Sequence, residues 1–342
     1  MKGSYFLDNK TFEVREQVLP ELGDNDVLVR NMACGVCGTD AHIYAGEAFA
    51  DELEPPVVLG HEFSGKVEKV GKAVKGIKSG DKVTIDPNIY CGKCRPCHNG
   101  KKHLCENLGA VGVNRDGGFA DYCVVPSEQV FVLGDDVDYE AGAMSEPLAC
   151  CLHGIDQAGI KPGNTVLIVG GGAIGNMMVQ LAKMSGAAKV ILSEPVAKRR
   201  EMGEQMGADA SFDPFSQDPA KQIKALTGKD GADVIIECAG TMEAVQQAFE
   251  CAAKGATIVQ FSVPPSADTY AINPHDMFKK EITYIGSFVN PYTHARAAEL
   301  LTSGRINVKP LITHRFGIED VEKAIHMHLS DESIKVMVVT DI

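Results

Sequence analysis

The chain has 342 residues, of which 44% are hydrophobic, and its formal net charge is −13. This length suffices for about two domains, each with its own core. The lysines and arginines are scattered and form no basic stripe, so nucleic acid is not an expected partner.

The N-terminal segment, MKGSYFLDNKTFEVRE, lacks the apolar core of a signal peptide and predicts a strand, a turn and a second strand. No run of 18 apolar residues occurs in the chain, so we expect no membrane span and a cytoplasmic protein. Short strand-like runs continue to about residue 150, among them DVLVRNMAC, FSGKVEKVG and FADYCVVP. Glycines and prolines separate them, which predicts an antiparallel, barrel-like β domain.

Four of the eleven cysteines crowd into one short segment, as Cys91, Cys94, Cys97 and Cys105. Crowded cysteines in a cytosolic protein are more often metal ligands than disulfides. Four thiolates fill a tetrahedral shell and leave no open position, which favours a structural Zn²⁺. A ferredoxin-type iron–sulfur motif competes, but it requires three residues and not seven before the fourth cysteine, and a proline after it.

A second set of candidate metal ligands is spread along the chain: Cys37, His61, Glu62 and Glu146. Sulfur, nitrogen and oxygen ligands from distant segments are typical of a catalytic zinc that keeps one position for substrate. Taken singly, the same residues also fit ordinary roles. These are a small buried cysteine, a core histidine, and an acid at a helix start before Pro147.

From about Gly159 the pattern changes to strands that alternate with helices. The runs NTVLIVG, KVILSE, ADVIIECAG and ATIVQF read as buried strands, and 173–185 has apolar residues at helical spacing. Such alternation predicts a parallel, doubly wound sheet. We expect a first domain over 1–150, a dinucleotide-binding domain over 151–285, and a return of 286–342 to the first domain.

The first strand of this second domain is followed by G-x-G-x-x-G and then by the predicted helix. In that setting the pattern is typical of a dinucleotide-binding turn, with Gly170, Gly172, Ile174 and Gly175 as its candidate cofactor-binding residues and Gly172 nearest the pyrophosphate. Glu194 ends the next strand, where a carboxylate accepts the ribose hydroxyls and favours NAD over NADP. Arg199 and its basic neighbours could still accommodate a 2′-phosphate, and Glu194 could instead be a solvated acid at the strand end.

Taken in order, GVCGTD, GHEFSGKVEKVG, CGKCRPC, SEPLACCLHG and GGGAIG resemble the medium-chain zinc alcohol and polyol dehydrogenases over nearly the whole chain. The resemblance implies a GroES-like β catalytic domain built from both chain ends, with a Rossmann domain inserted between them. The SEPLA and NVKPLITHRF segments are similar to the branch of sorbitol, threonine and arabitol-phosphate dehydrogenases.

The resemblance also implies roles for individual residues. It assigns Cys37, His61 and Glu62 to the catalytic zinc and makes Glu146 a ligand or water-bridged neighbour, which leaves open the carboxylate that binds directly. Asp40 would orient the zinc-bound histidine. Thr39 would take the substrate proton and pass it through the cofactor ribose to His42.

The implied activity is the reversible oxidation of a secondary hydroxyl of a small-molecule polyol or polyol phosphate to a ketose, with NAD as hydride acceptor. Oxidation of a β-hydroxy amino acid such as threonine is the alternative, and a non-enzymatic zinc- or nucleotide-binding protein is a third. Val289 stands where sorbitol-type enzymes have an arginine, which weakens the case for sorbitol itself and leaves Asn290 as a candidate partner for a substrate hydroxyl. We further expect a homo-oligomer, a tetramer or a dimer.

Overall fold

The computed structural model describes residues 1–7, 10–47 and 53–340. The chain divides into two units: unit 1 is formed by Met1–Ala149 with Asn290–Ile342, and unit 2 by Cys150–Val289. The connections between the units lie inside a helix, at Ala149, and in a loop, at Val289. In the described part of the chain, no helix has the length and hydrophobicity needed to cross a membrane.

Unit 1 is rich in β-structure. The predicted N-terminal pair of strands is present as antiparallel β1 and β2, with β4 on the other side of β1. A larger sheet has the order β10-β6-β5-β3-β18-β17, with β9 also paired to β3, and β7 pairs with β8. The strands of unit 1 are β1 (Lys2–Leu7), β2 (Thr11–Glu16), β3 (Asp26–Gly35), β4 (Val57–Val58), β5 (Glu62–Val70), β6 (Lys82–Ile85), β7 (Asn88–Ile89), β8 (Gly109–Ala110), β9 (Tyr122–Pro126), β10 (Val130–Val132), β17 (Ile312–Phe316) and β18 (Lys335–Val339).

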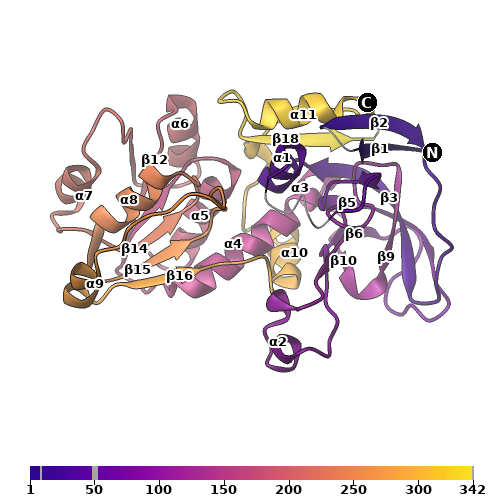
Figure 1. The fold of residues 1–342 in the computed structure, drawn as a ribbon, viewed down its shortest axis with the longest axis horizontal. Coiled ribbons are helices and arrows are strands. Elements are labelled where there is room, and N and C mark those ends of the chain that lie inside the picture. The colour runs from indigo at the N-terminus through magenta and orange to yellow at the C-terminus, as the bar shows by residue number, and fades with distance from the viewer. Residues whose placement is uncertain (8–9, 48–52, 341–342) are drawn as a thin grey trace. The chain divides into compact units, whose positions relative to one another are not determined.

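The larger sheet joins the two ends of the chain, because β18 pairs antiparallel with β3 (Figure 1). Strand β3 has an alternating pattern at its start, with Val27 and Val29 buried, as a sheet with one solvated face requires. Large apolar side chains such as Phe63 and Phe119 fill the core under it. The helices of unit 1 are α1 (Gly38–Ala45), α2 (Arg95–His98), α3 (Tyr139–Ala143), α10 (His294–Thr302) and α11 (Val321–His328), with short 3₁₀ turns at η2 (Lys102–Leu104), η3 (Ser127–Gln129), η4 (Lys309–Leu311) and η5 (Ile318–Asp320). Helix α4 (Ser145–Ala158) spans the boundary between the units.

Unit 2 is a parallel six-stranded sheet in the order β13-β12-β11-β14-β15-β16. The run TVLIV of β11 is buried at every position, because helices cover both faces of a doubly wound sheet. The strands are β11 (Thr165–Val169), β12 (Lys189–Ser193), β13 (Ala210–Phe212), β14 (Ala232–Glu237), β15 (Ala252–Gln260) and β16 (Thr283–Gly286). The helices between them are α5 (Ala173–Met184), α6 (Ala197–Gln205), α7 (Pro219–Thr227), α8 (Met242–Glu250) and α9 (Pro274–Lys280).

The predicted fold class, a β-rich domain with a doubly wound domain, is therefore confirmed. In unit 2 the strand order reverses direction between β11 and β14. Ligands of such sheets bind beyond the carboxyl ends of the strands at this reversal.

Candidate functional site

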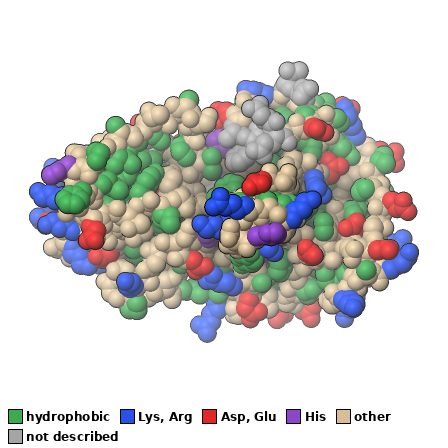
Figure 2. Space-filling view, turned by 60° about the horizontal axis from the view of Figure 1, so that its bottom comes forward, with side chains coloured by type: hydrophobic (Ala, Val, Ile, Leu, Met, Phe, Trp, Pro, Cys, Tyr) green, Lys and Arg blue, Asp and Glu red, His purple; other side chains and the backbone are tan. Residues whose placement is uncertain are grey.

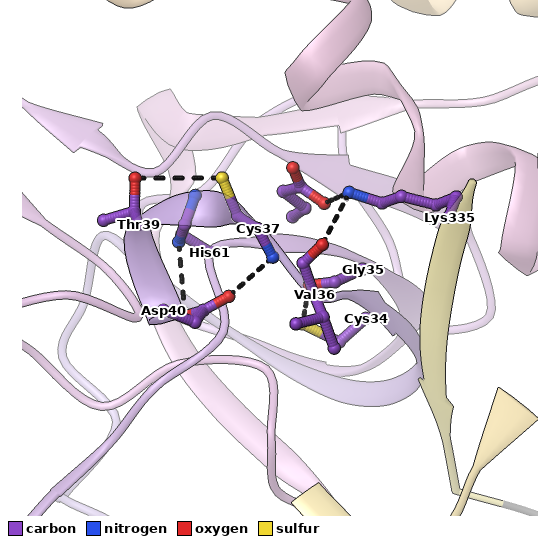
Figure 3. A network of polar contacts seen from close by, with 9 residues as sticks. Cys34, Gly35, Val36, Cys37, Thr39, Asp40, His61 and Lys335 are labelled. Carbon is purple, nitrogen blue, oxygen red and sulfur yellow. Dashed lines mark hydrogen bonds and ion pairs between the residues drawn. The ribbon is translucent and has the colours of Figure 1, made fainter. Parts of the chain in front are cut away.

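Strand pairing in unit 1 gathers three distant segments at one end of the sheet. Gly35 at the end of β3 pairs with Glu62 on one side and with Met337 of β18 on the other. The residues just beyond these pairs are Cys37, His61 and Lys335, which lie close together (Figure 3). The antiparallel register of the sheet therefore places these side chains in one site.

The ligand atoms of Cys37, His61 and Glu62 lie within 4.8 Å of one another. Nδ1 of His61 points at the Asp40 carboxylate, 3.8 Å away, which leaves Nε2 for a metal. The other Asp40 oxygen accepts the N–H of Cys37 at 2.8 Å. Asp40 therefore contacts two of the three residues, as a carboxylate that orients metal ligands would.

Burial and neighbouring charges shift the pKa values of Asp40 and His61. Burial raises the pKa of Asp40 to about 6. Burial opposes protonation of His61, but the negative groups around it, Cys37 first, raise the pKa of His61 well above its ordinary value. Oδ1 of Asp40 and Nδ1 of His61 are buried and have no hydrogen-bond partner among the described residues. A buried cluster of acidic character with sulfur, nitrogen and oxygen donors fits a zinc ion.

Helix α1 begins next to this cluster. Its N-cap is Cys37, and the Sγ of Cys37 lies 3.7 Å from Oγ1 of Thr39. His42 is three residues after Thr39 and so shares its side of the helix. Nδ1 of His42 lies 2.8 Å from the Glu47 carboxylate. Thr39 and His42 thus form a line of polar groups that leads away from Cys37.

Glu146 lies in the first turn of α4 and is buried. It is outside the close group formed by Cys37, His61 and Glu62. Its charge nevertheless contributes to raising the pKa of His61 and of Lys335, so it lies within electrostatic reach. The structure thus groups Glu62, and not Glu146, with the other two candidate ligands.

Lys335 is a part of this site that the sequence did not indicate. Its ammonium group forms an ion pair with the Glu62 carboxylate and donates to the Val36 carbonyl at 3.0 Å. Both charged side chains are almost fully buried. The one available signal was a lysine directly before the apolar run VMVV, at the start of a buried strand.

The second candidate metal site is the cysteine lobe, residues 91–105 of unit 1. The four Sγ atoms lie within 4.8 Å of one another, with Cys91–Cys97 and Cys94–Cys105 separations of 4.0 and 3.9 Å. A tetrahedron with Zn–S bonds of 2.3 Å requires S–S distances of about 3.8 Å. Backbone N–H groups, that of Lys93 first, lower the pKa of Cys91 to about 6, and Cys105 accepts two more N–H groups. All eleven cysteines are free thiols, so no disulfide competes for these sulfurs.

Lysine, arginine and histidine side chains gather near the middle of Figure 2, over the part of unit 1 that carries the lobe. The lobe itself contains Lys93, Arg95, Lys101 and Lys102 and no acidic residue. Ammonium groups near the thiolates favour their ionised form, the form that binds a metal.

Unit 2 carries the dinucleotide turn between β11 and α5. Gly170 has φ of +100°, which favours glycine. A Cβ at Gly175 would overlap the Gly170 carbonyl, whereas a Cβ at Gly172 would meet nothing within 4 Å. The turn is therefore closely packed at Gly175 and open at Gly172, where a phosphate could approach the backbone. It lies at the N-terminus of α5, and Ile174 is in the first turn of that helix.

Glu194 follows β12 and is buried next to this turn. One of its oxygens accepts the N–H of Gly171 at 2.6 Å, and the other accepts that of Val196 at 2.8 Å. The solvated acid considered from sequence is thus not found. Arg199, in the first turn of α6, is half-buried, and the guanidinium of Arg200 donates to the carbonyls of Glu194 and Pro195.

Family models match both units. The alcohol dehydrogenase GroES-like domain matches residues 23–135, and the zinc-binding dehydrogenase domain matches residues 173–303. The L-threonine 3-dehydrogenase of Pyrococcus horikoshii is 34% identical over 331 residues, which are 95% of this chain and 94% of that protein.

Two solved structures are similar over the whole chain. A zinc-binding dehydrogenase of Sinorhizobium meliloti bound to NADP is 42% identical, with a TM-score of 0.93 over 99% of this chain and 98% of that one. Galactitol-1-phosphate dehydrogenase of Escherichia coli is 29% identical, with a TM-score of 0.90 over 99% and 100% of the two chains.

The chain therefore belongs to the zinc-dependent medium-chain alcohol dehydrogenase family, and the resemblance noted in the sequence is confirmed. It is an oxidoreductase that uses zinc and NAD(P) to act on CH–OH groups.

Proposed function

We propose that this protein oxidises the secondary hydroxyl of a β-hydroxy amino acid, with L-threonine as the first candidate. The observation that carries the proposal is the close group of Cys37, His61 and Glu62 in a chain that matches L-threonine 3-dehydrogenases over nearly their whole length. This reverses the order of preference that the sequence suggested, in which a polyol came first.

In this proposal Cys37, His61 and Glu62 hold the catalytic zinc, and Glu146 is a nearby carboxylate that can replace or assist Glu62. Such an ion supplies a Lewis acid that lowers the pKa of a bound hydroxyl. The residues Cys91, Cys94, Cys97 and Cys105 hold a second, structural zinc, which clamps the lobe and takes no part in the chemistry.

Side chains of the protein would transfer the proton of the substrate hydroxyl to solvent. Thr39 is adjacent to Cys37 and is placed to accept the proton of the substrate hydroxyl. His42, one turn further along α1, would receive it next and release it toward solvent, since a quarter of its side chain is exposed. Asp40 holds the ring of His61 and the backbone of Cys37 in position.

The dinucleotide would lie on the turn formed by Gly170, Gly172, Ile174 and Gly175, with Glu194 and Arg199 near the adenosine ribose. The bound cofactor would supply the hydride acceptor. We propose that NAD is preferred, because Glu194 places a buried carboxylate directly beside the turn. A 2′-phosphate would have to approach that negative charge.

A polyol or polyol phosphate remains the second candidate substrate. It is supported by the likeness of the whole chain to galactitol-1-phosphate dehydrogenase. The decisive experiment is a rate comparison on L-threonine, pentitols, hexitols and their phosphates, with NAD and with NADP. The highest kcat/KM on L-threonine supports the proposal, and a higher value on a polyol or its phosphate overturns it in favour of the second candidate.

We further propose a homo-oligomer. Strand β16 ends the sheet of unit 2, and its residues Thr283 and Tyr284 are exposed. Figure 2 shows hydrophobic side chains on a face of that unit, and Phe278 of α9 is 86% exposed. An open strand edge with apolar neighbours favours pairing with a second copy. Light scattering of the purified protein tests this proposal.

We also propose a reducing compartment such as the cytoplasm. The free cysteine thiols support it, because disulfides are rare there.

A further inference from the structure

Unit 2 contains a buried carboxylate that the proposed chemistry does not use. Glu237 is the last residue of β14 and is fully buried. One of its oxygens accepts the N–H groups of Ala239 and Gly240, at 2.6 and 2.8 Å. The other accepts the amide of Gln260, at 2.6 Å, and the hydroxyl of Ser262. A single side chain thus satisfies four donors.

These donors come from the loops that follow two neighbouring strands. Ala239 and Gly240 lie just after β14, and Gln260 and Ser262 lie at the end of β15. The hydroxyl of Tyr284 on β16 donates to the Gln260 amide oxygen at 2.9 Å and extends the network by one strand. Glu237 therefore ties together the carboxyl ends of β14 and β15, and Gln260 connects this network to Tyr284 of β16.

The tied loops border the dinucleotide turn. A Cβ at Gly170 would lie 3.1 Å from the backbone nitrogen of Ala239, so the loop after β14 packs directly on the turn. The N–H of Cys238 donates to the carbonyl of Val169 at 2.8 Å and fixes the same contact. The loop thus lies beside the dinucleotide turn, on the β14 side of the reversal between β11 and β14, where ligands of such sheets bind.

We infer that Glu237 is a positioning residue for the nicotinamide half of the bound dinucleotide. The inference rests on the proposed dinucleotide site. In a sheet of this order each half binds one end of the dinucleotide. The turn at Gly170 and Glu194 belong to the first half, and the loops that Glu237 holds belong to the second. A carboxylate is required because every group that faces it is a donor.

The test is Glu237→Gln, which keeps the shape of the side chain but turns an N–H₂ group toward donors. Binding of NADH and of ADP-ribose, which lacks only the nicotinamide, is measured by calorimetry on the full chain. We expect the NADH affinity to fall about tenfold or more, the effect of losing one good hydrogen bond, and the ADP-ribose affinity to change by less than about twofold.

Asp233→Asn is the matched control. Asp233 lies in the same strand β14, and its carboxylate also accepts a backbone N–H, that of Thr165 at 2.7 Å, but at the opposite end of the sheet. This variant should bind both ligands like the wild type. If Glu237→Gln does not fold, Ser262→Ala removes one donor from the same network and should weaken NADH alone.

If Glu237→Gln loses affinity equally for NADH and for ADP-ribose, Glu237 is a general stabiliser of unit 2 and the inference is overturned. Unchanged NADH affinity would overturn it as well. A wild type that binds neither ligand would contradict the proposed dinucleotide site itself, which is a distinguishable result.

Discussion

Lys335 of β18 and Glu62 of β5 form their buried ion pair directly across Gly35, the residue of β3 that lies between them. A Cβ at Gly35 would overlap the Glu62 carboxylate and lie 2.8 Å from Cε of Lys335. The glycine therefore leaves the space through which the two charges meet. Glu62 faces a fixed cation on one side and the proposed metal position on the other.

Replacing Lys335 with methionine should make stability depend more strongly on zinc. Without metal, the variant leaves the Glu62 carboxylate buried and unpaired, which costs about 3–5 kcal/mol. Bound zinc supplies the missing positive charge. The difference in unfolding midpoint between zinc-loaded and chelator-treated protein should thus be larger than in the wild type. Lys335→Arg, which keeps the charge, is the control, and equal differences in all three proteins would contradict the prediction.

His61→Ala and Cys37→Ser should abolish turnover and leave NADH binding nearly intact. Losing a ligand removes the charge that stabilises the alkoxide, an effect of several kcal/mol and hence several decades of rate. The dinucleotide turn lies in the other unit and is not altered. Steady-state rates and NADH fluorescence titration measure the two effects. Substantial turnover in either metal-depleted variant would exclude zinc chemistry at this site.

The active protein should contain two zinc ions per chain with different lability. The cysteine lobe offers four sulfurs and no open position, whereas the site at Cys37 is open to a chelator. Cys97→Ser should lower the zinc content to one and expose 91–105 to limited proteolysis. Cys37→Ser should lower the zinc content equally but leave the lobe resistant. Metal analysis before and after brief chelation provides the measurement, and a single ion in fresh active enzyme refutes the two-site model.

Glu194→Ala should narrow the preference for NAD over NADP. The change removes the negative charge beside the 2′ position and the acceptor for the N–H of Gly171. Loss of this acceptor should also loosen the turn and weaken the binding of both cofactors. Glu194→Gln, which retains an acceptor, therefore serves as the comparison. The ratio of kcat/KM for the two cofactors is the readout. A wild type that uses NADP at least as efficiently as NAD would show that this carboxylate does not select the cofactor.

Stability should fall in mild acid because of His294. Burial lowers the pKa of His294 to about 3, from an unfolded value of 6.5. Between these values the unfolded chain binds a proton that the folded chain does not. At pH 4.5 this difference in proton binding lowers the free energy of unfolding by about 2–3 kcal/mol relative to pH 7.

His294→Gln should reduce the dependence of the unfolding free energy on pH. In urea unfolding measured between pH 4 and 7, the variant should take up about one proton fewer on unfolding than the wild type. Burial raises the pKa of the nearby Asp86, which acts with the opposite sign, so the comparison is between variant and wild type. Parallel curves for the two proteins would show that His294 is not the source of acid sensitivity.

The features that sequence could predict are those coded locally. The Gly170 turn and the four cysteines of the lobe are short motifs, and the structure brings the residues of each together. The pair of Lys335 and Glu62 joins residues 273 positions apart, and only the β5–β3–β18 register makes them neighbours. A lysine before an apolar strand gives no sign of such a partner.

Burial was likewise hard to anticipate. Asn290 was a candidate partner for a substrate hydroxyl, but its side chain is fully buried and bonded to Asn88, Asp86 and His294. Glu237 lies within ADVIIECAG, whose apolar pattern predicts a buried strand and does not single out the glutamate. In both cases the partners come from other strands and loops, which periodicity in one segment does not indicate.

The pairing of β3 with β18 also sets an order of events during synthesis. Domains fold as units as they leave the ribosome. Unit 2 and the cysteine lobe are continuous segments, so each can close as soon as it emerges. The site at Cys37 is completed later, because Lys335, the ion-pair partner of Glu62 in this site, is synthesised after all of unit 2. A nascent chain can therefore load its structural metal and complete its nucleotide fold well before its reactive centre is finished.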